Sequence, residues 1–203
     1  MKYVNSQDNG SRDSKPLVNG GIPMERATIA TVWLEGCAGC HMSFLDIDEA
    51  LLDILPRIEL TDSPITDFKD FNFRRVDVGI IEGAIGNDEQ LEIARRLRDR
   101  CKILVAWGDC AVFGGINTLR NAIAKEDVLK CAYIDSASTV DGIIPDDREL
   151  PVLLQKTVPV NRMVEVDVYV PGCPPSPEAI AYSLTEILEG RIPVLTAHMI
   201  HFD

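Results

Sequence analysis

The chain has 203 residues, of which 46% are hydrophobic and 26% are charged, values that are ordinary for a single globular α/β domain. Its net charge is −12, from 32 acidic and 20 basic residues, so neither nucleic acid nor an anionic membrane surface is expected as a partner. No apolar run approaches the roughly 18 residues of a membrane span, and no membrane association is predicted.

Segments with β-type and α-type patterns alternate along the chain. Apolar runs that predict buried strands lie at residues 28–34, 76–81, 102–107 and 166–170. Helices are predicted at 41–55, from the Asn87 cap to about 100, at 118–124, and from the Ser176 cap to Gly190. This alternation implies right-handed crossovers and a mostly parallel, doubly wound sheet.

Three parts of the chain differ in composition. Residues 1–26 are a polar N-terminal tail, residues 27–193 form the folded domain, and residues 194–203 are an apolar C-terminal tail that we expect to dock on a partner. Within the domain, 58–60 and 160–164 have short strand patterns, whereas 135–160 is irregular and rich in Pro and Asp. The N-terminal region has no secretory leader or twin-arginine pair, so a cytoplasmic location is expected.

Four of the six cysteines follow predicted strands directly. Cys37 and Cys40 come after the first strand, Cys110 after the third and Cys173 after the fourth. Because the carboxyl ends of parallel strands point toward the same crevice, these four thiols are predicted to meet at one edge of the sheet. Cys101 and Cys131 lack this position and are interpreted as small buried hydrophobic residues.

Three kinds of site compete for the four thiols. A redox dithiol needs only Cys37 and Cys40 and leaves the other two unexplained. A structural zinc ion usually takes two close pairs, but here one pair and two distant single cysteines occur. An iron–sulfur cluster tolerates irregular spacing because the fold brings its ligands together, and this interpretation is favoured.

The four segments around these residues resemble the small subunit of nickel–iron hydrogenases. They are WLEGCAGCHMSF (33–44), VGIIEGAIG (78–86), WGDCAVFGGIN (107–117) and VPGCPPSPEAI (170–180). The resemblance implies a flavodoxin-like domain that holds one [4Fe–4S] cluster through Cys37, Cys40, Cys110 and Cys173. The catalytic nickel–iron centre would lie in a large-subunit partner, so this chain would supply no catalytic residue of its own.

The subfamily is indicated by where the chain ends and by the missing export signal. Relatives with further clusters carry an additional cysteine-rich domain, whereas this chain ends at Asp203, so a single cluster is expected. The resemblance is strongest to the short small subunits of NAD-reducing soluble hydrogenases. It implies diaphorase partners that carry FMN and further iron–sulfur clusters and that pass electrons to NAD⁺.

Other assignments stay open at the level of sequence. A deazaflavin-linked hydrogenase, a quinone-reducing respiratory complex and a zinc-stabilised interaction module are the alternatives. A flavin is not predicted, because the cysteine pair occupies the loop that seats a flavin phosphate in this fold.

Residues outside the cysteine set carry less specific expectations. Glu35 is either a proton relay or a polar residue at a subunit seam. Glu82 either binds partner groups near the cluster or forms an ordinary salt bridge, and Trp107 is expected to pack beneath the cluster loop. The histidines His41, His198 and His201 are expected at the surface or at an interface.

Overall fold

The computed structural model describes residues 26–67 and 74–200. Its centre is a five-stranded sheet with the order β2-β1-β3-β5-β7, in which all neighbouring strands are parallel. These strands are β1 (Ala27–Trp33), β2 (Ile58–Asp62), β3 (Val76–Glu82), β5 (Cys101–Trp107) and β7 (Val168–Val170). The strand order reverses between β1 and β3, as in flavodoxin-like folds. The predicted doubly wound α/β class is therefore confirmed.

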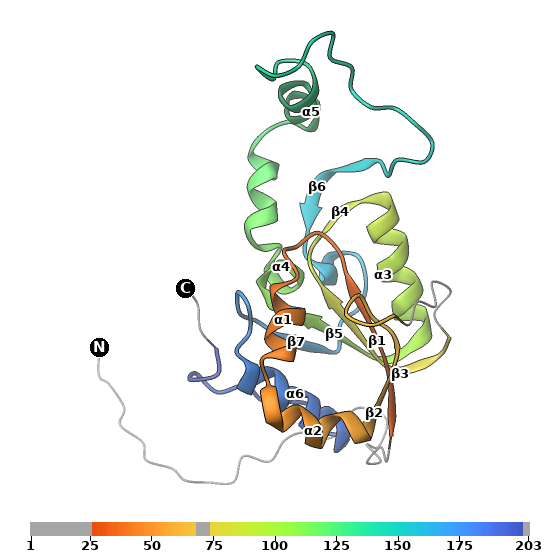
Figure 1. Cartoon of the computed structure of the whole chain (residues 1–203), viewed down its shortest axis with the longest axis vertical. Helices are drawn as coiled ribbons and strands as arrows, with labels where there is room; N and C mark the ends of the chain where they lie inside the picture. The colour runs from red at the N-terminus through yellow and green to blue at the C-terminus, as the bar shows by residue number, and fades with distance from the viewer. Residues whose placement is uncertain (1–25, 68–73, 201–203) are drawn as a thin grey trace, which may run out of the picture.

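Helices cover both faces of this sheet (Figure 1). One core is closed by α1 (Gly39–Leu45), α2 (Leu51–Ile54) and α6 (Pro177–Leu188), and the other by α3 (Asp88–Arg100) and α4 (Gly108–Phe113). Adjacent strand residues point into opposite cores, as Ile80 and Ile81 of β3 do, because side chains alternate along a strand. No helix in the described part of the chain has the length and apolar character needed to cross a bilayer.

A smaller unit extends beyond the main sheet. The antiparallel pair of β4 (Ile85–Asn87) and β6 (Leu153–Val158) lies next to the 3₁₀ segment η3 (Gly115–Ala122) and to α5 (Lys125–Tyr133). Figure 1 shows α5 and the long connection to β6 standing away from the sheet. The segment 135–160 is therefore irregular only in its first part, because its second part supplies β6.

Several predicted elements differ from the structure for local reasons. The helix expected at 41–55 is divided into α1, α2 and two 3₁₀ turns, and Asp48 within it has a positive φ of 56°. The helix expected at 118–124 is the 3₁₀ segment η3 instead, and the strand pattern at 160–164 is a 3₁₀ turn, Val160–Arg162. In contrast, the caps at Asn87 and Ser176 accept hydrogen bonds from backbone N–H groups as predicted.

Asp77 joins three strands at the amino end of the sheet. Its Oδ2 accepts hydrogen bonds from the Thr28 amide (2.9 Å) and hydroxyl (2.8 Å), and its Oδ1 accepts one from Lys102 Nζ (2.7 Å). Burial by itself raises the pKa of Asp77, but the bonds from Lys102 and Thr28 outweigh it and leave this pKa below its usual value. The ionised carboxylate therefore stabilises the fold.

We expect Asp77→Asn to lower the free energy of unfolding by about 2 kcal/mol at neutral pH, because hydrogen bonds to a charged group are lost. A carboxyl whose pKa is depressed by folding contributes fully above its unfolded pKa of about 4, and this contribution disappears as the pH falls through the folded value. Urea unfolding at pH 7 and at acid pH checks this. The exposed control Asp99→Asn should change stability by less than about 0.5 kcal/mol, and a deficit of Asp77→Asn that persisted unchanged in acid would contradict the assignment.

Candidate metal centre

Three loops at the carboxyl edge of the sheet carry the four predicted thiols. Cys37 and Cys40 lie at the turn from β1 into α1, Cys110 lies in α4 directly after β5, and Cys173 follows β7. Cys40 is buried, Cys110 is half-buried, and Cys37 and Cys173 are exposed. The four cysteines thus lie at different depths, with Cys40 in the interior and Cys37 and Cys173 at the surface.

Burial and the charges of neighbouring thiols on the three loops raise the pKa values of Cys40 and Cys110. Burial raises the pKa of Cys110, and the charges of Cys173 and Cys37 raise it further. Burial also raises the pKa of Cys40, followed by the charges of Glu82, Cys110 and Cys37. Thiolates are therefore costly here without a cation to neutralise them. Iron or zinc would supply that positive charge, because both bind cysteine as the thiolate.

Two hydrogen bonds fasten the Cys110 loop to the Cys173 loop. The Asp109 amide donates to Gly172 O (2.9 Å), and the Gly172 amide donates to Asp109 Oδ1 (2.8 Å). Gly108, with a φ of 79°, has no room for a side chain, because a Cβ there would lie 2.3 Å from Cys40 Sγ. The Ser43 hydroxyl of α1 also donates to Pro175 O (2.6 Å), so all three cysteine loops are tied together.

Glu82 is the buried anchor of the first cysteine loop. As the last residue of β3 it accepts hydrogen bonds from the amides of Cys40 (3.2 Å) and His41 (3.0 Å), and its carboxylate also contacts His41 Nδ1. Burial alone raises the pKa of Glu82, but the bonds from His41 and Cys40 outweigh it and lower this pKa. Glu82 therefore fixes the backbone of Cys40 from the end of β3.

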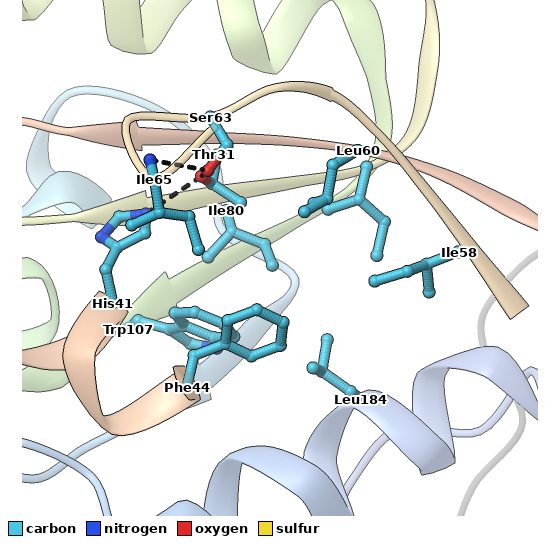
Figure 2. A pocket seen from close by; sticks show the side chains of 11 residues that line it. Thr31, His41, Phe44, Ile58, Leu60, Ser63, Ile65, Ile80, Trp107 and Leu184 are labelled. Carbon is cyan, nitrogen blue, oxygen red and sulfur yellow. Dashed lines mark hydrogen bonds between the residues drawn. The ribbon is translucent and has the colours of Figure 1, made fainter. Parts of the chain in front are cut away.

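His41 is 1% exposed, so the expectation of a surface or interface histidine was wrong for this residue. Its Nε2 lies 3.0 Å from Thr31 Oγ1, which in turn lies 2.7 Å from Ser63 Oγ. Figure 2 shows the imidazole between Thr31 and the indole of Trp107, beside a cavity large enough for about one water. Nothing in the local pattern around His41 distinguishes it from a surface residue, because its partners come from distant strands.

Trp107 lies beneath the first cysteine loop, as predicted. It is 1% exposed, its carbonyl accepts a hydrogen bond from Cys40 Sγ (3.7 Å), and its ring packs against Phe44 with 5.8 Å between centroids. The Trp107 side chain thus supports α1 from the core side. Figure 2 shows the two rings side by side among the residues that line the cavity.

The remaining cysteines and histidines do not join this group. Cys101 opens β5 and is buried, as expected, but Cys131 lies on α5 and is exposed. The interpretation of Cys131 as a buried hydrophobic residue was therefore wrong, because α5 was not predicted and stands away from both cores. His198 lies in the C-terminal segment, and His201 is outside the described residues.

The spacing of the thiols bears on which metal they fit. Within residues 26–67 and 74–200, no three His, Cys, Asp or Glu side chains converge closely enough to hold a single metal ion. All ligands of one zinc ion lie about 2.0–2.3 Å from it, whereas the cysteines of a [4Fe–4S] cluster surround a larger body. Four thiols on three neighbouring loops at the crevice of the sheet are the kind of donor set that such a cluster takes.

The fold and the cysteine loops together define a doubly wound α/β protein that presents a thiol site at the carboxyl edge of its sheet. A protein-family model, described as the NADH ubiquinone oxidoreductase 20 kDa subunit, matches residues 37–187. The chain belongs to this family.

Several relatives of this chain are hydrogenase subunits. Over 170 residues the chain is 40% identical to a subunit of the F420-non-reducing hydrogenase of Methanothermobacter marburgensis, and the match covers 82% of this chain and 55% of that protein. It is 38% identical over 166 residues to the delta subunit of the NAD-reducing hydrogenase HoxS of Cupriavidus necator, with 80% and 79% covered. The chain thus spans about half the length of the first relative and most of the second.

A solved structure matches more completely. A chain from the crystal structure of an NAD⁺-reducing [NiFe]-hydrogenase in the H₂-reduced state superposes with a TM-score of 0.84 at 39% identity, covering 88% of this chain and 99% of that one. The [NiFeSe] hydrogenase of Desulfovibrio vulgaris Hildenborough matches in fold alone, with a TM-score of 0.53 at 17% identity. The resemblance to hydrogenase small subunits is therefore confirmed as a relationship of homology.

Proposed function

We propose that this chain is the electron-transfer small subunit of a cytoplasmic [NiFe] hydrogenase and holds one [4Fe–4S] cluster through Cys37, Cys40, Cys110 and Cys173. The observation that supports the proposal is the placement of these four thiols just past the carboxyl ends of β1, β5 and β7, in a fold that matches nearly the whole of a chain from an NAD⁺-reducing hydrogenase. The partners in this proposal are a large subunit with the nickel–iron centre and diaphorase subunits with FMN and further iron–sulfur clusters.

The residues of this chain would bind and insulate the cluster rather than perform acid–base chemistry. When bound, a [4Fe–4S] cluster supplies one-electron transfer at a potential set by burial and hydrogen bonds. Glu82 and the Asp109–Gly172 contacts hold the loops, while Trp107 and Phe44 exclude water on the core side. The exposed Cys37 and Cys173 leave the other side open toward a partner.

Exposed apolar side chains beside Cys110 support a permanent partner. Phe113, Ile116, Leu119 and Ile123 follow Cys110 along α4 and η3 and are 57%, 72%, 70% and 56% exposed. A run of this size is a liability for an isolated protein and is typical of an interaction surface. We assign this apolar face, Phe113 to Ile123, to the large subunit because it adjoins the thiol group.

We expect Leu119→Asp to reduce the amount of large subunit that co-purifies with the chain by about tenfold or more, because a charge would enter a buried contact. The matched control is Leu52→Asp, which has the same 70% exposure but lies on α2, a helix that packs on the opposite core of the sheet from α4. Circular dichroism checks that both variants fold. Equal losses of partner in the two variants would place the interface elsewhere.

The proposal also includes the electron acceptor, which is NAD⁺ or the acceptor chain of an F420-non-reducing hydrogenase. The 99% coverage of a chain from an NAD⁺-reducing enzyme favours NAD⁺, whereas the 40% identity to a subunit of an F420-non-reducing hydrogenase favours a different acceptor chain. Hydrogen-dependent reduction of NAD⁺ by the complex isolated without oxygen distinguishes the two. Activity with artificial dyes but not with NAD⁺ would support the second assignment.

The proposal as a whole is tested by gentle anaerobic purification of the chain with its bound subunits. We expect a coloured complex that contains nickel and about four iron atoms per copy of this chain, beyond those of its partners. A colourless chain that contains zinc would contradict the proposal and would support an interaction module instead.

A further inference from the structure

The backbone of Glu35, two residues before Cys37, is held from two sides. Its amide donates to Ala84 O (3.0 Å), and the Ala84 amide donates to Glu35 O (2.8 Å). The same Glu35 carbonyl accepts a hydrogen bond from Asn117 Nδ2 of η3 (2.6 Å). The start of the first cysteine loop is therefore attached both to the segment after β3 and to η3.

The Glu35 side chain occupies a space that only glycine leaves open. A Cβ added at the buried Gly86 would lie 1.4 Å from Glu35 Oε2, which is far inside van der Waals contact. Gly86 is not one of the glycines with a positive φ, so the absence of a side chain here serves the neighbouring carboxylate and not the backbone conformation. Any larger residue at 86 would push the carboxylate out.

A buried hydroxyl holds that carboxylate in place. Thr157 of β6 is 1% exposed, and its Oγ1 donates to Glu35 Oε1 (3.3 Å). The same Oγ1 accepts hydrogen bonds from Arg120 Nε (3.2 Å) and Nη2 (2.8 Å). The guanidinium thus polarises the hydroxyl toward Glu35 without occupying the space of the carboxylate.

Thr157 and Arg120 are themselves fixed in position. The side-chain amide of Asn121 makes two hydrogen bonds to the backbone of Thr157. Asn121 Nδ2 donates to Thr157 O (2.7 Å), and Asn121 Oδ1 accepts from the Thr157 amide (2.8 Å). Arg120 also donates to Leu154 O (3.1 Å) and to Gly86 O (3.3 Å). The unit built from η3, β4 and β6 therefore presents a rigid socket to the cysteine loop.

We propose that Thr157 and Arg120 are positioning residues for the cluster: they lock Glu35 above Gly86 and thereby set where Cys37 and the Glu35 carboxylate stand relative to the metal. The inference rests on the proposed iron–sulfur function. The proposal assigns a role to the unit of η3, β4 and β6. Thr157 of this unit holds Glu35 of the first cysteine loop, which is 122 positions away along the chain. The proposal also explains the small residue at position 86.

The experiment uses the full-length chain purified without oxygen, with EPR spectra of the reduced cluster and a redox titration as readouts. We expect Thr157→Val to shift the g values and the midpoint potential, and Thr157→Ser to restore both, because serine keeps the hydroxyl. The matched control is Thr28→Val, since the Thr28 hydroxyl also donates to a carboxylate, that of Asp77, but at the opposite end of the sheet. The control should lower stability and leave the spectrum unchanged.

A double-mutant cycle supplies the second readout. Gly86→Ala should shift the spectrum in the chain with Glu35, and it should add nothing in a Glu35→Ala background, where no carboxylate is left to displace. Additive shifts, or a shift in Thr28→Val equal to that of Thr157→Val, would overturn the positioning role. If the wild-type chain gives a cluster spectrum and none of these variants changes it, the positioning role is overturned, whereas the proposed function stands. A wild-type chain without a cluster would overturn both.

Discussion

Cys110→Ser is expected to abolish the iron–sulfur spectrum of the chain and the hydrogen-dependent electron transfer of its complex. Cys110 is one of the four proposed ligands, and the Asp109–Gly172 hydrogen bonds tie its loop to the loop of Cys173. A serine oxygen has nearly the size of the thiol but is a harder and less acidic ligand, which iron–sulfur chemistry disfavours. The expected loss is complete because the fold offers no neighbouring thiol in the same loop.

The control for this variant is Cys131→Ser. Cys131 is exposed on α5 and lies outside the thiol group, so its replacement should leave the iron content and the visible spectrum at wild-type values. Iron analysis and absorption spectra of proteins purified without oxygen measure both effects. Retention of full activity by Cys110→Ser would instead favour a redox dithiol made of Cys37 and Cys40, which does not need a thiol at position 110.

The second large effect is expected for Glu82→Ala, which should lower the free energy of unfolding of the chain by about 3 kcal/mol or more. Glu82 is 2% exposed and His41 1% exposed, so the change leaves a buried imidazole and two buried amides without their acceptor. Buried donors without partners cost about 1–3 kcal/mol each. The same change frees the loop that carries Cys40.

Urea unfolding measures this destabilisation, with Glu92→Ala as the control. Glu92 is 70% exposed on α3 and pairs with Arg96 at 3.8 Å, and such surface pairs contribute less than about 1 kcal/mol. Glu82→Gln should fall between the two variants, because its amide oxygen still accepts one of the N–H bonds. If Glu82→Ala were as stable as Glu92→Ala, the carboxylate would not anchor this loop.

The position of the four cysteines followed from the sequence because two short-range rules were enough. Apolar runs of strand length located β1, β5 and β7, and parallel strands end at a common edge. The cysteine motifs sit directly after those runs, so their placement at that edge needed no knowledge of side-chain contacts. The caps at Asn87 and Ser176 were predictable for the same reason, because a cap bonds to an amide three residues away.

The contacts that hold the site were decided only by the tertiary structure. The His41–Glu82 contact and the Thr157–Glu35 contact join residues that are 41 and 122 positions apart, and no periodicity in the sequence records such pairs. Likewise, α1 ends at Leu45 instead of continuing to 55, because packing on α6 and the turn at Asp48 override helical spacing. The sequence by itself determined the sheet and the thiols at its edge, since those depend on local patterns, whereas long-range packing alone determined which polar residues surround them.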